Sequence, residues 1–141
     1  MRVFRLMVLL VICSSLQYSN PTNFKIIGSP TINISISSGD KLELAEIKFK
    51  NTTSKDLLLN WKTTDLTFLK EWDYSMCAYG KCQVGIPKKG TLRKIPAGKT
   101  GFIAIHILPK GNKGSGLVKF DLYDPKNQNQ RVRLRFNVEV K

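Results

Sequence analysis

One histidine, three cysteines and ten acidic residues in a chain of 141 leave little material for a catalytic or metal centre. The single histidine, His106, has no evident partner for general acid–base chemistry. The sequence has no glycine-rich phosphate loop, nucleophile elbow or His-Glu-x-x-His motif. Asp65, Glu71 and Asp73 lack the dense oxygen spacing of a calcium loop. We therefore expect no catalytic residue, no cofactor and no resident metal, so a protein that is not an enzyme.

Long hydrophobic runs are also absent, apart from one near the N-terminus. Residues 6–12 form an unbroken apolar stretch, which is far shorter than the roughly 20 residues of a membrane-spanning helix. Arg2 and Arg5 precede it, and small or polar residues follow it. This order is typical of a secretory signal peptide. We expect a cleaved signal peptide over 1–19 and one exported domain over 20–141, with no transmembrane segment. The exported chain would lie in the periplasm, at the outer membrane or outside the cell.

A lipid anchor is the alternative to simple cleavage. Residues 10–13 read Leu-Val-Ile-Cys, which has the outline of a lipoprotein box with Cys13 as the lipidated residue. Such a box normally carries a small residue just before the cysteine, and Ile12 is bulky. We therefore keep lipidation at Cys13 as the second choice.

Export decides how the other two cysteines are interpreted. Cys77 and Cys82 are separated by four residues, and in an oxidising compartment such a pair is most simply a disulfide. The loop-closure model gives about 2 kcal/mol for so small a ring. A metal-binding or thiol-handling site of copper type is the alternative, with Met76 and His106 as further members. Two thiols alone do not complete a metal coordination shell.

Alternation of apolar and polar residues dominates the rest of the chain. Residues 31–37 carry three isoleucines at every second position, and 103–107 repeat the pattern. About seven such segments occur, with turn signals at short intervals and no helical period. Residues 109–116, rich in glycine, are expected to be a hairpin connection. This pattern predicts an all-β fold, a single antiparallel sandwich with Trp61 buried on its third strand.

Several local motifs carry a family resemblance. They are Trp-Asp-Tyr-Ser-Met-Cys at 72–77, Cys82, Pro-Ala-Gly-Lys-Thr-Gly-Phe at 96–102, and Gly-Ser-Gly at 114–116 followed by Val118, Phe120 and Tyr123. Through them the chain resembles immunoglobulin-like domains of secreted and cell-surface proteins of Bacteroidetes. A more distant likeness is to the ASPM/SPD-2/Hydin-type sandwiches. The resemblance implies an immunoglobulin-like sandwich in an exported protein, and it carries no catalytic residues over.

Acidic residues are scarce mainly in the second half of the chain. The formal net charge is +13. Residues 20–77 hold seven lysines and seven acids, whereas residues 78–141 hold 14 basic and three acidic residues. The excess positive charge therefore belongs to the second half, and it raises the question of an acidic partner.

The last predicted strand concentrates this charge on one face. Arg131, Arg133 and Arg135 alternate with apolar residues, so all three point the same way, roughly 6.6–6.8 Å apart. Lys119 on the preceding strand and Lys62 on the third strand are expected to join them. Guanidinium groups in a row suit phosphate, carboxylate or sulfate groups. The alternative is a solvated basic face that discourages aggregation.

These observations favour an exported, non-enzymatic binding or structural module of the cell envelope or surface. Its partner would be an envelope or surface protein, or an acidic glycan such as lipopolysaccharide. Nucleic acid is disfavoured because aromatic side chains do not alternate with the arginines; Tyr123 is the only one nearby. A small periplasmic protein that handles thiols or a metal through Cys77 and Cys82 is the competing hypothesis.

Overall fold

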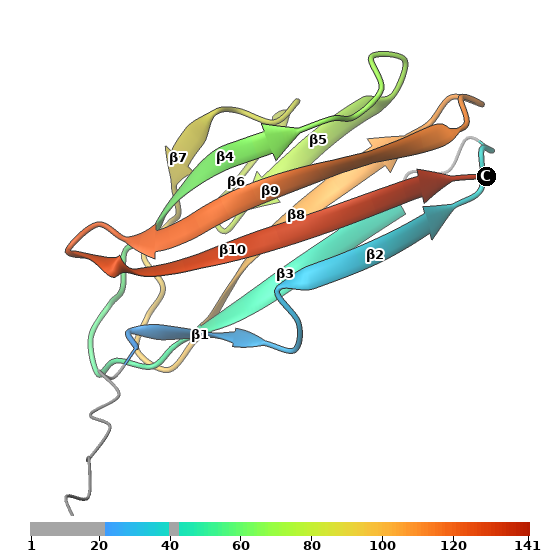
Figure 1. Cartoon of the computed structure of the whole chain (residues 1–141). Helices are drawn as coiled ribbons and strands as arrows, with labels where there is room; N and C mark the ends of the chain where they lie inside the picture. Colours follow the sequence, from blue (N-terminus) through green and yellow to red (C-terminus); the bar gives the residue numbers. More distant parts are fainter. Residues whose placement is uncertain (1–21, 40–42) are drawn as a thin grey trace, which may run out of the picture.

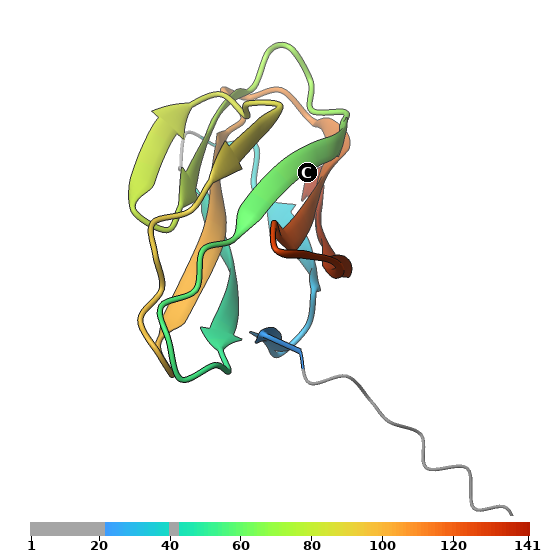
Figure 2. The same cartoon turned by 90° about the vertical axis from the view of Figure 1, so that its left-hand side faces the viewer.

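A computed structural model describes residues 22–39 and 43–141 as two β-sheets packed face to face (Figures 1 and 2). The predicted all-β sandwich is confirmed, and no helix occurs among the described residues. The predicted signal peptide at 1–19 and Cys13 lie outside them. The part of the chain that is described also contains no helix long and apolar enough to cross a membrane.

The strand count is higher than the sequence suggested, at ten instead of about seven. The additional strands are short, because three or four residues show too little alternation to be recognised. They are β1 (Phe24–Ile27), β6 (Lys81–Val84) and β7 (Lys89–Thr91). Each lies at the edge of a sheet.

Sheet A has the strand order β1-β3-β8-β5-β6, and all of its pairs are antiparallel. Its central strands are the longer ones. They are β3 (Glu43–Asn51), β5 (Asp73–Ala78) and β8 (Thr100–Leu108). The hairpin of β5 and β6 pairs Cys77 directly with Cys82.

Sheet B has the order β2-β10-β9-β4-β7. Its members besides β7 are β2 (Thr31–Ile36), β4 (Asn60–Leu66), β9 (Gly114–Asp124) and β10 (Asn127–Val140). The expectation of a wholly antiparallel sandwich is wrong for one pair, because β2 runs parallel to β10. The predicted hairpin at 109–116 is also wrong. This segment connects β8 of sheet A to β9 of sheet B.

The core lies between the sheets and is built from the inward positions of the alternating strands. Trp61 on β4 is 2% exposed, as expected of the buried tryptophan. Phe120 stands edge-on to both Trp61 and Phe136, with ring centroids 5.7 and 6.0 Å apart. Such edge-to-face packing is favourable for aromatic rings. Burial of this set forces the residues between them, on β4, β9 and β10, onto the opposite face of sheet B.

A buried asparagine fixes the connection that leaves β3. Asn51 is fully buried, and its Nδ2 donates to the carbonyls of Lys55, Ile95 and Pro96 at 2.8, 2.9 and 3.2 Å. Its Oδ1 accepts the backbone N–H of Thr53 at 2.8 Å. The side chain thereby ties the segment after β3 to the carbonyls that precede β8.

Candidate functional site

The outer face of sheet B brings all five predicted basic residues together. Strand β10 turns Leu134 and Phe136 into the core and the three arginines outward. In the register of the sheet, Arg133 lies opposite Asp121 of β9 and Arg135 lies opposite Lys119. Lys62 of β4 flanks Asp121 from the other side. The predicted residues Arg131, Arg133, Arg135, Lys119 and Lys62 therefore share one face. We use the name basic rows for the outward-facing positions of β10, β9 and β4 among which these five residues lie.

Two carboxylates interrupt the basic rows, and sequence reasoning missed both. Asp121 accepts from Arg133 Nε at 2.8 Å and from Arg131 Nη1 at 3.5 Å. Asp65 Oδ2 accepts a hydrogen bond from Lys119 Nζ at 3.1 Å. Five basic and two acidic side chains leave these rows with a net charge of +3. The spacing in the sequence could have revealed Asp121, because it lies two residues from Lys119 and therefore points to the same outward face of the strand.

Asp121 holds the two arginines that contact it in fixed positions. Its side chain is 5% exposed, whereas those of Arg131 and Arg133 are 48% and 61% exposed. The hydrogen bond from Arg133 to Asp121, followed by the charge of that carboxylate, raises the pKa of Arg133 above its ordinary value. Arg131 also lies over the ring of Tyr123, 5.3 Å from its centroid. Both guanidinium groups are thus held at the surface and remain accessible.

Arg135 is oriented by an amide rather than by an acid. Its Nε donates to Oδ1 of Asn137 at 2.7 Å, and Nδ2 of Asn137 donates to Oδ1 of Asn33 at 2.7 Å. Arg135 and Lys62 have no acidic partner among residues 22–39 and 43–141. The Nη groups of Arg135 are therefore available to an anion from solution.

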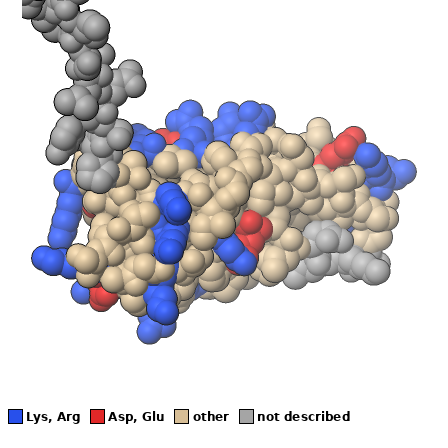
Figure 3. Space-filling view, turned by 90° about the horizontal axis from the view of Figure 1, so that it is seen from below, with Lys and Arg blue, Asp and Glu red and all other residues tan. Residues whose placement is uncertain are grey.

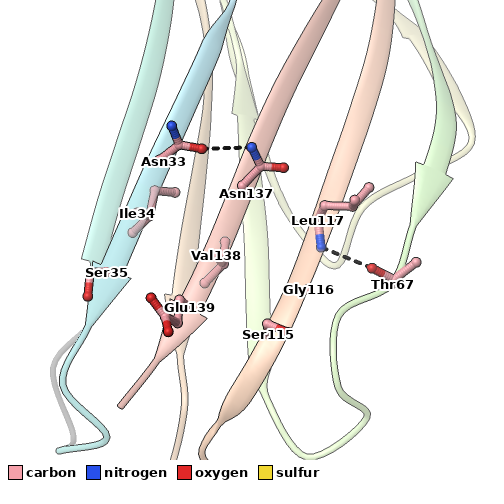
Figure 4. Close-up of a pocket in the computed structure, with 10 residues that line it drawn as sticks. All are labelled: Asn33, Ile34, Ser35, Thr67, Ser115, Gly116, Leu117, Asn137, Val138 and Glu139. Atoms are coloured by element: carbon pink, nitrogen blue, oxygen red, sulfur yellow. Dashed lines mark hydrogen bonds between the residues drawn. The ribbon is translucent and has the colours of Figure 1, made fainter.

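A shallow groove of about 590 Å³ continues from the basic rows along the same face. Its outward side chains are polar apart from one leucine, and they come from β2, β10, β9 and the segment after β4. Figure 4 shows the Asn33–Asn137 bond that joins β2 to β10, and Thr67 Oγ1 accepting the backbone N–H of Leu117. We call this feature the polar groove; its outward side chains are Asn33, Ser35, Thr67, Ser115, Leu117, Asn137 and Glu139.

Basic side chains also occur away from these rows. Figure 3, which views the molecule from below, shows Lys and Arg side chains at several separate places among uncharged surface. Lys25 and Lys50 are one such pair, opposite each other on β1 and β3 of sheet A. A test of the basic rows therefore needs a control that removes equal charge elsewhere.

The residues of the competing thiol or metal hypothesis are only partly brought together. Cys77 and Cys82 form the predicted disulfide. His106 points outward from β8 and places its Nε2 3.9 Å from Sγ of Cys77. Met76 is fully buried and faces the core, so it does not join them.

Acidic residues do not gather into a metal site either. Asp65 is paired with Lys119 on sheet B, and Asp73 is paired with Lys110 at 2.7 Å beside sheet A. Within the described part of the chain, no group of three or more His, Cys, Asp or Glu side chains could hold a metal ion.

Comparison with known proteins supports the fold. Neither a protein-family model nor a curated protein matches the sequence. The N-terminal domain of PorA has a TM-score of 0.56 at 14% identity, over 79% of this chain and 87% of that one. A family 123 glycoside hydrolase from Clostridium perfringens has a TM-score of 0.55 at 14% identity. That match covers 85% of this chain but 27% of the hydrolase. PapD-like domain 7 of human CEP192 aligns over 100% of this chain and 96% of that one, at a TM-score of 0.49 and 14% identity.

The first two similarities agree on the fold. At 14% identity they show the fold alone, which is an immunoglobulin-like β-sandwich. What this sandwich binds has to be argued from its own surface.

Proposed function

We propose that this protein is an exported, non-enzymatic binding module and that the outer face of sheet B holds an acidic glycan of the cell envelope or surface. One observation carries the proposal. Five basic side chains from three strands share a face with the polar groove, and Arg135 and Lys62 have no acidic partner in the described chain.

The geometry suits a linear polymer that carries acidic groups at intervals. Successive arginines on β10 lie roughly 6.6–6.8 Å apart, and each presents a planar fork that matches carboxylate or sulfate. The polar groove extends the same face with amide and hydroxyl groups, which suit the neutral hydroxyls of a sugar. Glu139 at its far end opposes an acidic group there. The acidic groups of the glycan are therefore expected over β10 between Arg131 and Arg135.

Export is supported by three features. The N-terminal 19 residues have the pattern of a signal peptide, and the Cys77–Cys82 disulfide is typical of an oxidising compartment. The sequence motifs also resemble immunoglobulin-like domains of secreted and surface proteins of Bacteroidetes. All three are compatible with a lipid anchor at Cys13, the second choice for the N-terminus.

Nucleic acid is a poorer ligand for this face than a glycan. Binding of single strands relies on aromatic side chains that stack on bases. Tyr123 is the aromatic residue of the basic rows, and Arg131 already covers its ring at 5.3 Å.

Retention on immobilised heparin, a sulfated and carboxylated glycan, tests the proposal. The triple variant Arg131→Gln, Arg133→Gln, Arg135→Gln removes three positive charges from the basic rows. We expect it to elute at much lower salt than the unmodified protein. Each lost contact to a sulfate or carboxylate group removes an ion pair, and the counterions released by that ion pair no longer favour binding. Arg135→Gln alone, which leaves Asp121 paired, is expected to give the largest single effect.

The matched control removes the same charge from elsewhere. Lys25→Gln, Lys50→Gln and Lys99→Gln neutralise three exposed lysines outside the basic rows. We expect this variant to lose much less retention than the arginine variant. Equal losses would show that net charge alone governs retention, which would contradict a localised site. If the protein bound a partner protein but no acidic glycan, contact with a protein would be favoured instead.

A further inference from the structure

The disulfide lies on the other sheet, sheet A. Cys77 and Cys82 are directly opposite each other in the β5–β6 hairpin, and β6 is an edge strand of sheet A. Cys77 points to the same outward side of β5 as Ser75, whereas Met76 and Ala78 face the core. The disulfide therefore lies on the outer face of the sandwich, away from the hydrophobic interior.

The two sulfurs have different surroundings. Cys82 is exposed on the edge strand, whereas Cys77 is half-buried between β6 and β8. Only Cys77 has the imidazole of His106 beside it, at 3.9 Å from Nε2 to Sγ. We expect an attacking thiolate to approach Cys82, which is the more exposed residue, and the sulfur that would then leave is the one next to the imidazole.

The surface around the disulfide is weakly charged and partly apolar. Val84, two residues beyond Cys82, is 94% exposed, and Leu44, the register partner of His106 on β3, is 60% exposed. Two acidic residues near it are paired: Glu46 with Lys48 at 3.0 Å and Asp73 with Lys110 at 2.7 Å. A groove of about 530 Å³ lies alongside, and its lining includes Ser75, Val84 and Leu108 together with the charged residues Lys70 and Asp73.

We propose that the Cys77–Cys82 disulfide is an exchange site for an aliphatic thiol, in which Cys82 is attacked, Cys77 leaves and His106 stabilises the leaving sulfur. This role is independent of glycan binding, because it uses the opposite sheet. In the first step the incoming thiolate forms a bond to Sγ of Cys82 and the Cys77–Cys82 bond breaks. The electron pair passes to Sγ of Cys77, which accepts a hydrogen bond or a proton from Nε2 of His106. A second thiol then releases Cys82, so that two thiols are oxidised to one disulfide and the protein becomes a dithiol.

The direct test treats the folded, oxidised protein with reduced glutathione. The reaction is stopped by alkylation, and the modified cysteine is located by mass spectrometry. We expect a mixed disulfide on Cys82 and an alkylated Cys77 without denaturant. A mixed disulfide on Cys77 would overturn the assignment. Reduction only after unfolding would show that the bond is purely structural and would overturn the proposal.

Variants of His106 test its part in the step. A hydrogen-bond donor beside a thiolate lowers the pKa of that thiol, and lowering the leaving-group pKa by one unit speeds exchange by about threefold. His106→Ala should therefore slow the reaction by about threefold or more, and His106→Gln, which keeps a donor, should slow it less. Thr100→Ala, an exposed residue at the opposite end of β8 from His106, is the matched control and should react at the unmodified rate. Equal rates for all variants would contradict a role for His106.

A second measurement does not depend on the exchange reaction. In Cys82→Ser, Cys77 is a free thiol whose ionisation can be followed by thiolate absorbance. We expect its pKa to rise when His106→Ala is added to this variant. An unchanged pKa would remove the basis for the proposed leaving group, whatever the rates.

Discussion

Neutralising Asp121 should strengthen anion binding at the basic rows. Its carboxylate is almost fully buried beneath Arg131 and Arg133 and accepts from Arg133 at 2.8 and 3.3 Å. Asp121→Asn keeps the size of the side chain and one acceptor oxygen, while it raises the net charge of these rows from +3 to +4. Arg131 stays in place because it is also held over Tyr123, and Arg133 keeps the remaining side-chain oxygen at position 121 as an acceptor.

The size of the effect follows from the positions of the charges. An anion held by either guanidinium lies roughly 6 Å from the carboxylate of Asp121, and two unit charges at that separation in water repel by about 0.7 kcal/mol. Removing this repulsion corresponds to about threefold tighter binding of each such anionic group. The gain should shrink as salt rises, because the screening length falls to about 8 Å at physiological ionic strength.

Titration of a heparin oligosaccharide by calorimetry at two salt concentrations measures this effect. The control is Glu46→Gln, which removes one carboxylate from an ion pair on sheet A and should leave the affinity unchanged. Asp121→Asn should also lower the thermal midpoint of unfolding, because two guanidinium groups lose their charged acceptor. Weaker binding by a folded Asp121→Asn protein would refute the reasoning, since it would mean that Asp121 organises the site more than it neutralises it.

Three further predictions concern the fold. Gly101→Ala should lower the free energy of unfolding by about 1–3 kcal/mol, because an added Cβ would lie 2.6 Å from Ile95 Cδ1 and 2.7 Å from Phe49 Cε2. Gly39→Ala, where the added Cβ meets nothing within 4 Å, should change it by less than about 0.5 kcal/mol, and similar urea midpoints for both would contradict the packing described. Asn51→Asp should cost about 3 kcal/mol, because it removes the donor to three carbonyls and buries a charge; a melting temperature equal to the unmodified protein's would refute this. Replacing Cys77 and Cys82 together by Ala should cost about 2 kcal/mol, and an unfolded product would show that the disulfide does more than close a small loop.

Alternation in the sequence determined how much of the fold could be predicted. It places the inward residues of β4, β9 and β10 correctly, because these strands are long and each has one buried face. It does not identify the partner of a strand. Residues 31–36 read equally well as an antiparallel strand, but they pair in parallel with β10. The glycine-rich segment 109–116 could likewise join neighbouring strands of one sheet or cross between sheets, and it crosses.

The same limit applies to the site. The common face of Arg131, Arg133 and Arg135 follows from their spacing, and Lys119 and Lys62 join it because β9 lies between β10 and β4. Asp65 and Asp121 belong to this face for the same reason, yet their effect depends on which cation each one meets across the sheet. The contact between His106 and Cys77 also required the register of β5 on β8, because the two residues are 29 apart in the chain.

Glycan binding by the outer face of sheet B is tested most directly by mapping where an acidic glycan touches the folded protein. We would titrate a heparin oligosaccharide into isotopically labelled protein at physiological salt and follow backbone amides and arginine Nε–H groups by NMR. We expect the perturbed signals to lie on the outward positions of β10, β9 and β4, with Arg135 among the strongest, and to extend into the polar groove. Perturbations centred on sheet A, or spread over all exposed lysines alike, would contradict this expectation.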